Sequence, residues 1–160
     1  MNKTRVVVFT IIFFLIVTVI CSYLYMQSIK LNHISCNAFY VAKNPEARLV
    51  SENHMELKNG IGSWMMNGRV NVSDKDVYYF KLRSQFSVKR TGYVFYVTNK
   101  KVMLSPNDMS KNKVLQEFLA AILRVEDAQS FFTIKPINEN YIIYSGEVPI
   151  MYCMSDNRWR

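Results

Sequence analysis

The sequence lacks the residues that most metal sites and catalytic motifs require. It has only two histidines and three cysteines in 160 residues. No Cys-x-x-Cys pair occurs, and neither His33 nor His54 stands in a cluster of other ligands, so we expect no metal site. No nucleophile elbow, phosphate-binding loop or zinc motif is present. We therefore predict a protein that is not an enzyme, with no catalytic residues and no cofactor.

Glycine and proline are also scarce, with five and four residues, and we find no internal repeat and no low-complexity linker. The part from residue 30 onward has the size of one ordinary domain, which can bury a core without metal support.

Charge is absent from Val6 to Ile29. The segment 6–26 is almost purely apolar, and a helix of that length matches the roughly 30 Å apolar core of a bilayer. Lys3 and Arg5 precede it and favour a cytoplasmic N-terminal tail. The sequence thus predicts a cytoplasmic tail (1–5), a transmembrane helix (6–26), a short tether (27–35) and an exported domain (36–160).

A cleaved signal peptide is the alternative interpretation of this run. Its apolar region normally covers about 7–15 residues and ends in small residues. Here the run is longer, and bulky Ile20 occupies the position that should be small for cleavage after Ser22 or for a lipoprotein signal at Cys21. Tyr23 and Tyr25 suit the interface of a retained anchor, which we therefore favour.

The chain is basic, with 20 Lys and Arg against 12 Asp and Glu. Without Lys3 and Arg5, the exported part would have 18 against 12, a net charge of +6. No run of four or more basic residues occurs, and an exported domain meets no nucleic acid. We expect a solvated surface with mild attraction to anionic lipid or to an acidic partner.

The three cysteines differ in their surroundings. Cys21 lies in the apolar run, as a lipid-facing or helix-packing residue. Cys36 and Cys153 lie near the two ends of the exported domain, and in an oxidising compartment such a pair favours a disulfide. Two free buried thiols, or cysteines too far apart to join, are the alternatives.

Alternating apolar and polar residues predict strands over most of the exported domain. The clearest alternation runs from Tyr78 to Lys89, and a similar one covers 64–72, with a turn at 73–76 between them. Further strands are expected at 93–97, 102–104, 131–135, 141–145 and 148–154, with weaker ones at 35–42 and 48–58. Asn99 and Lys100 would separate two of them. Pro149 cannot donate to a ladder, so it predicts an edge or a strand start.

One segment has helical spacing instead. From Val114 to Val125 the apolar residues share one face, which predicts an amphipathic helix of about three turns capped by Asp108 or Ser110. The predicted fold is mainly β with one amphipathic helix (α+β): a transmembrane helix followed by an antiparallel meander of about eight strands that can close into a barrel.

The domain is rich in aromatic residues and methionine. Most of these side chains must form the core, but a surplus can also line a lipophilic pocket or a partner interface. The side chains expected to face inward, as core or as pocket, are Trp64, Met66, Phe80, Leu82, Phe86, Phe95, Phe118 and Ile122. Sensing of pH by His33 or His54, both expected in loops, has little support.

The layout resembles the FidL-like inner-membrane proteins, which are similar to the ToxS, PsaF and MyfF accessory proteins of ToxR-type regulators. The resemblance rests on residues 1–26, on Cys36, on the strand from Gly62 to Val72, and on the ending Tyr152-Cys153-Met154.

The resemblance implies a single-pass protein of the bacterial inner membrane, with a lipocalin-like periplasmic barrel that is completed or closed by its partner. That partner would be a ToxR-like membrane transcription regulator, bound as a heterodimer through the periplasmic domains and kept stable and active. The genes controlled would include adhesins and fimbriae, and the signals would include acidity and bile-salt-like amphiphiles. A lipophilic-ligand sensor or carrier, and a fimbrial assembly factor, are the alternative functions.

Overall fold

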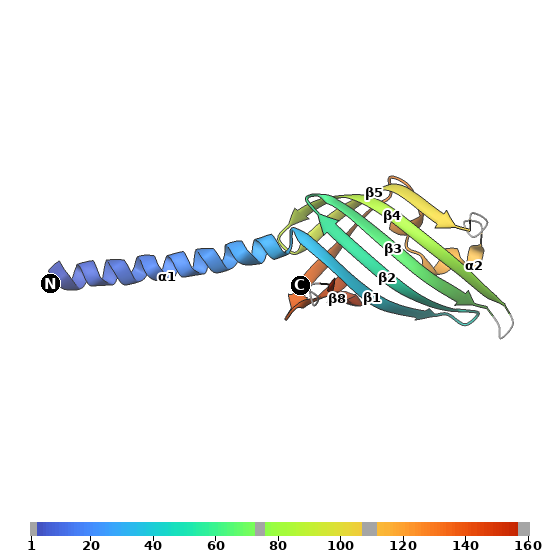
Figure 1. The fold of residues 1–160 in the computed structure, drawn as a ribbon, viewed down its shortest axis with the longest axis horizontal. Helices are drawn as coiled ribbons and strands as arrows, with labels where there is room; N and C mark the ends of the chain where they lie inside the picture. The colour runs from blue at the N-terminus through green and yellow to red at the C-terminus, as the bar shows by residue number, and fades with distance from the viewer. Residues whose placement is uncertain (1–2, 73–75, 107–111, 157–160) are drawn as a thin grey trace. The chain divides into compact units, whose positions relative to one another are not determined.

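The computed structural model describes residues 3–72, 76–106 and 112–156, and the predicted turn at 73–76 and the two predicted helix caps lie mostly outside these ranges. The chain divides into two compact units, 1–32 and 33–160. The first is the helix α1 (Lys3–Lys30) and the second is a β-barrel (Figure 1).

Helix α1 is apolar on all sides. Its segment Val8–Tyr25 has a mean hydropathy of 2.5, and none of it is buried by the rest of the chain. The hydroxyl of Thr18 donates to the carbonyl of Phe14 at 2.7 Å, so this polar group is satisfied within the helix. A helix that is apolar all round needs an apolar environment, and α1 is long enough to cross a bilayer.

The helix extends beyond the predicted span, and this changes the predicted tether. Residues 27–30 continue α1, a turn follows at 31–32, and the first strand already begins at His33. No proline or glycine interrupts residues 27–30, so the helical backbone can continue past the apolar run. The helix and the barrel are therefore joined by two residues instead of the nine assigned to a tether.

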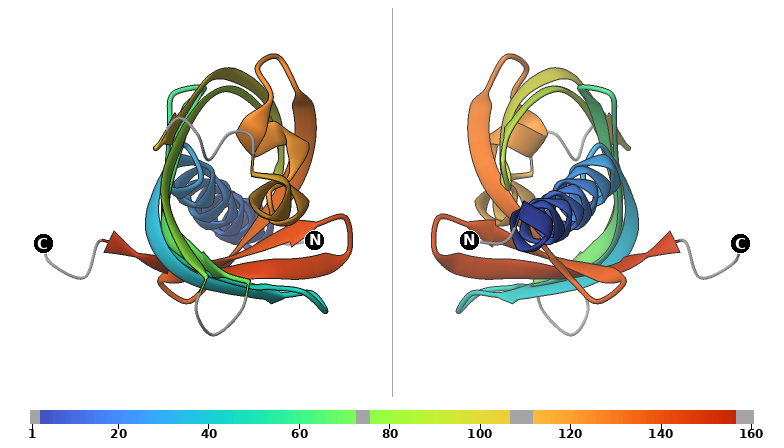
Figure 2. Two further views of the ribbon diagram at one scale, coloured as in Figure 1. Left: turned by 90° about the vertical axis from the view of Figure 1, so that its right-hand side faces the viewer. Right: turned by 90° about the vertical axis from the view of Figure 1, so that its left-hand side faces the viewer.

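The barrel is a closed antiparallel meander of eight strands in sequence order (Figure 2). The strands are β1 (His33–Lys43), β2 (Arg48–Lys58), β3 (Ile61–Asn71), β4 (Val77–Thr91), β5 (Val94–Ser105), β6 (Gln129–Ile137), β7 (Asn140–Ser145) and β8 (Val148–Ser155). This confirms the predicted mainly β, barrel-forming fold. The turn between β2 and β3 is typical of a hairpin, with φ of 50° at Asn59 and 80° at Gly60.

Alternation in the sequence sets the two faces of the wall. In β4 the even-numbered positions from Phe80 to Phe86 are buried, and the odd-numbered positions beside them face solvent. The core is the packed barrel interior, whose largest fully buried side chains include Phe95, Ile34, Leu49 and Met55.

Two predictions about the segment 93–125 are wrong. Strand β5 is continuous, because Asn99 and Lys100 form a bulge opposite Gln85 and Phe86 instead of a turn. The predicted three-turn helix is two short helices, α2 (Lys113–Phe118) and α3 (Ala121–Arg124), with Leu119 and Ala120 extended between them. Asn112 accepts a hydrogen bond from the Leu115 amide at the start of α2, and the predicted caps Asp108 and Ser110 lie outside the described residues.

Buried polar side chains explain both differences. Asn99 is fully buried; its amide donates to the Ile122 carbonyl at 2.6 Å, and its carbonyl accepts from the Lys101 amide. The hydroxyl of Ser84 donates to the Leu123 carbonyl at 2.9 Å. These bonds satisfy the carbonyls at the end of α3, so α3 is held against β4 and β5 by tertiary hydrogen bonds in place of helical ones.

Candidate functional site

The first and last strands meet along an incomplete seam. Strand β1 pairs with β2 along its whole length, from His33 to Lys43. With β8, however, it pairs only at Cys36–Ser155 and Asn37–Met154. In these two fully described strands, residues 38–43 of β1 and 148–153 of β8 have no ladder partner across the seam. The barrel wall is therefore weakest between β1 and β8.

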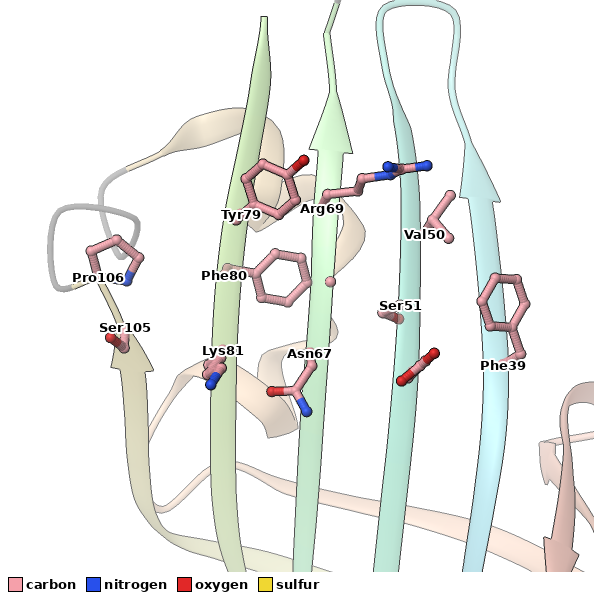
Figure 3. A pocket seen from close by; sticks show the side chains of 12 residues that line it. Phe39, Val50, Ser51, Asn67, Arg69, Tyr79, Phe80, Lys81, Ser105 and Pro106 are labelled. Atoms are coloured by element: carbon pink, nitrogen blue, oxygen red, sulfur yellow. The ribbon is translucent and has the colours of Figure 1, made fainter.

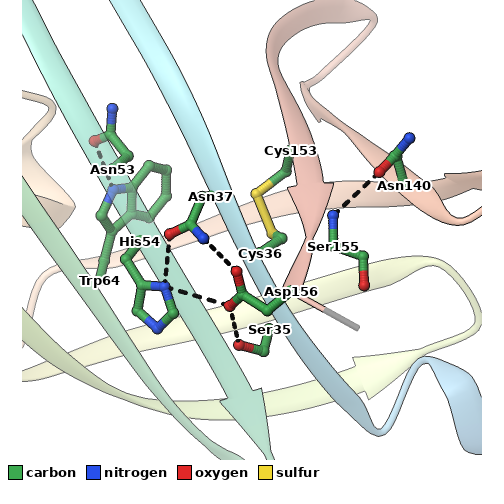
Figure 4. Close-up of a disulfide and its surroundings, with 10 residues drawn as sticks. All are labelled: Ser35, Cys36, Asn37, Asn53, His54, Trp64, Asn140, Cys153, Ser155 and Asp156. Carbon is green, nitrogen blue, oxygen red and sulfur yellow. Dashed lines mark hydrogen bonds and ion pairs between the residues drawn. A yellow bond between two sulfur atoms is a disulfide. The ribbon is translucent and has the colours of Figure 1, made fainter. Parts of the chain in front are cut away.

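A disulfide fastens the closed end of this seam (Figure 4). Cys36 of β1 is bonded to Cys153 of β8 across a sequence separation of 117 residues. Both cysteines are fully buried, so the bond lies on the inner side of the wall. The predicted pairing is confirmed, and it joins the two strands at the place where their ladder is short.

A polar cluster fastens the same end on the outer side (Figure 4). The Asp156 carboxylate accepts from the Ser35 hydroxyl at 2.6 Å and from the Asn37 amide. His54 Nδ1 lies 2.9 Å from the Asn37 carbonyl oxygen and 3.6 Å from Asp156. Two strands, β1 and β2, and the residue after β8 thus meet in one network at the closed end.

The cluster does not have the geometry of a catalytic triad. The Ser35 hydroxyl donates to Asp156, whereas a nucleophilic serine would bond to the histidine. Within the described residues, no group of three or more histidine, cysteine or acidic residues could hold a metal ion. His33 and His54 lie on β1 and β2, so their expected placement in loops is wrong.

The inside of the barrel contains a cavity of about 230 Å³ that reaches the seam. Tyr40 of β1 lines it on one side of the seam, and Ser145, Ile150 and Met151 of the β7–β8 hairpin line it on the other. Its remaining walls come from the barrel interior and the short helices: Asn53, Trp64, Met66, Phe86, Phe118, Ala120, Ile122, Leu123, Ser130, Phe131 and Phe132. The cavity therefore lies beside the open part of the seam.

The eight predicted inward-facing residues divide between cavity and core. Five of them line the cavity: Trp64, Met66, Phe86, Phe118 and Ile122. Phe80 packs against Gly68, Leu82 lines a separate space of about 100 Å³ beside α2, and Phe95 stacks on Phe132 with ring centroids 6.0 Å apart. Phe118 and Ile122 are half-buried, and the other six are buried.

Few polar side chains line the cavity, and the buried Asn53 among them is already hydrogen-bonded. The Trp64 indole donates to the Asn53 carbonyl at 3.0 Å, and the Asn53 amide donates to the buried Ser51 hydroxyl at 3.3 Å. The cavity is thus mostly apolar, with Tyr40, Ser130 and Ser145 as further polar residues of its lining, which suits an amphiphilic chain.

The sequence analysis missed Tyr40, Asn53, Ile150 and Met151 as cavity residues. Asn53 occupies a buried position within the alternation of β2, and the alternation could therefore have placed its side chain inside the barrel. The others line the cavity only because the first and last strands come together, which no local pattern encodes.

The Tyr141 hydroxyl lies on β7 opposite Cys153. Burial raises its pKa above the usual value, because the ionised form would lose hydration. Tyr141 is therefore neutral at physiological pH and adds no charge beside the disulfide.

Comparison of the chain with models of known protein families, and with the sequences of curated proteins, finds no match.

Proposed function

We propose that this protein is a membrane-anchored accessory subunit that binds and stabilises a ToxR-like membrane transcription regulator through the open seam of its barrel. In this proposal α1 spans the bacterial inner membrane, the N-terminus is cytoplasmic and the barrel is periplasmic. A buried disulfide is consistent with an oxidising compartment.

The seam is the observation that supports the proposal best. An unpaired strand edge is a template for pairing with another chain, and proteins normally protect such edges with charge. Strand β8 has no charged residue, and its side chains Val148, Ile150, Tyr152 and Met154 are between 39% and 64% exposed. Across the seam, Phe39 and Val41 of β1 are exposed as well. The seam therefore offers backbone groups together with apolar contact area, as strand-addition sites do.

Charged residues placed on this edge test the proposal. We expect V148K/I150K to lower the amount of the neighbouring-gene regulator that co-purifies with the full-length protein by about tenfold, since lysine on an edge opposes strand pairing. V125K is the control, because Val125 is an exposed apolar residue after α3, outside the seam.

The Cys36–Cys153 bond, seen on a non-reducing gel, reports whether each variant has folded. Equal recovery of the regulator with V148K/I150K and with V125K would contradict the use of the seam. Unchanged regulator level and output after deletion of the gene would contradict the function itself.

The cavity favours a second function, the binding of a lipophilic ligand. Its volume of about 230 Å³ lies below the roughly 300–1,000 Å³ of typical ligand pockets. A rigid four-ring bile salt fills more space than a single flexible chain. We therefore propose a medium-chain amphiphile as the better candidate of the two.

Trp64 provides a direct measurement, because it lines the cavity. We expect decanoate to change its fluorescence saturably in full-length protein held in nanodiscs and carrying Trp159→Phe, and a bile salt to change it less. Ile122→Phe adds bulk to the cavity lining and should weaken the response, whereas Tyr96→Phe on the outer wall should not. A linear response that matches empty nanodiscs would show partitioning into lipid and contradict binding.

A further inference from the structure

The outer wall formed by β3, β4 and β5 has basic side chains and no acidic ones. The three strands contain Arg69, Lys81, Arg83, Lys89, Arg90, Lys100 and Lys101, and neither Asp nor Glu. Alternation directs five of them outward, and all five are exposed: Arg69, Lys81, Arg83, Lys89 and Lys101. We call these five residues the basic face.

Charges on this face lie close to one another. Lys81 and Arg83 are two residues apart on β4 and therefore on the same side, about 7 Å apart along the strand. Lys101 of β5 pairs with Gln85, and Arg83 pairs with Met103, so Lys101 and Arg83 are diagonal neighbours. Like charges at such spacing repel each other across a sheet.

Two ion pairs of the described residues leave this charge in place: His54–Asp156 lies outside the face, and Lys100–Asp127 uses the bulge lysine. Glu126 accepts from the Val102 amide of β5 at 3.4 Å. Glu52 and Glu56 lie on the neighbouring strand β2 and are exposed.

Two hollows make the basic face more than a charged surface. One, of about 560 Å³, lies across β1–β5 between exposed Phe39 and Tyr79, and Arg69, Lys81 and Glu52 line it (Figure 3). The other, of about 390 Å³, lies toward the opposite end of β4, where Arg83, Lys58, Ile61 and Glu56 line it. Basic residues outnumber the single glutamate in each hollow. Aromatic side chains beside arginine are enriched at protein interfaces.

We propose that the basic face is a docking surface for an acidic segment of another protein, separate from the seam. Its shape favours a protein over a bilayer. The basic side chains of β4 on this face run from Lys81 to Lys89, eight residues or about 26 Å of strand, and hollows lie beside them. An acidic segment of a protein can follow such an elongated and uneven surface. The proposal does not depend on which partner occupies the seam.

The test uses the full-length protein in nanodiscs of zwitterionic lipid, with fluorescent poly-glutamate of about twenty residues as the probe. Charge reversal by K81E/R83E should weaken binding by about tenfold, and salt at about 1 M, where the Debye length falls to about 3 Å, should abolish it. K43E/K135E makes the same change in net charge away from the basic face and should alter binding by less than about twofold. Lys81 and Arg83 are exposed, so thermal unfolding should confirm that both variants are folded.

Chemical acetylation of lysines identifies the occupied surface. We expect poly-glutamate to protect Lys81 and Lys101 and to leave Lys43 and Lys135 reactive. Equal weakening by the two double variants, or no binding by the wild type, would overturn the proposal. Protection of Lys81 and Lys101 by phosphatidylglycerol nanodiscs, without protection by poly-glutamate, would assign the face to lipid and overturn it as well.

Discussion

Replacing both bridged cysteines by serine (C36S/C153S) is expected to lower the free energy of unfolding of the barrel by about 4–5 kcal/mol. The bond closes a loop of 117 residues, and in the chain-entropy model such a long loop gives a disulfide nearly its full stabilisation. For a domain of this size, that loss corresponds to a fall in Tm of about 10 °C or more.

The position of the bond adds to its effect. Only two residue pairs join β1 to β8, and the disulfide lies beside both of them. Without it, the polar cluster of Ser35, Asn37, His54 and Asp156 is the remaining fastening of the closed end. The seam should then open, so hydrogen exchange should increase first in β1 and β8 and only later in β3 and β4.

Thermal unfolding of the full-length protein, followed by circular dichroism, measures the loss. C21S is the control, since Cys21 lies in α1 and is free. Equal Tm values for C36S/C153S, C21S and the parent protein would show that the bond does not stabilise the barrel.

Much of the barrel could be predicted from alternation alone. The pattern from Tyr78 to Lys89 gave the inner and outer faces of β4 correctly, because a wall between core and solvent imposes period two on every strand. The apolar run 6–26 likewise identified α1, since the length and composition of a helix decide whether it can cross a bilayer.

Local pattern failed where distant contacts decide the backbone. Asn99 was interpreted as a turn residue because asparagine favours turns, yet it is buried in β5 and bonds to the Ile122 carbonyl. The same contact is one reason why the helical pattern at 114–125 does not give a single helix. A single sequence shows that a residue is polar, but not which carbonyl it will reach.

The candidate site also has features that local pattern predicts and features that depend on distant contacts. Apolar positions such as Trp64 and Phe86 were identified as inward-facing, but which of them line a cavity depends on how the barrel closes. Pro149 indicates an edge in the last strand, and the short β1–β8 ladder is consistent with that prediction. The length of the open seam follows from the strand register, which the sequence alone did not reveal.

Phe95→Ala is expected to destabilise the barrel by about 3–5 kcal/mol, as the loss of a fully buried aromatic side chain typically does. Phe95 is 2% exposed and stacks on Phe132, with an angle of 9° between the rings. It does not line the cavity, so the space left by its ring would be a new void in the core.

Two other variants, Tyr96→Ala and Phe118→Ala, make this prediction specific. Tyr96→Ala removes a ring of similar size from the next position of β5, but Tyr96 faces outward and is 52% exposed, so we expect a cost below about 1 kcal/mol. Phe118→Ala enlarges the existing cavity at a half-buried position and should change ligand binding more than stability. Denaturant unfolding of the three variants separates these effects. If Phe95→Ala cost no more than Tyr96→Ala, the interior of the barrel would be loosely packed, and the boundary drawn here between core and cavity would be wrong.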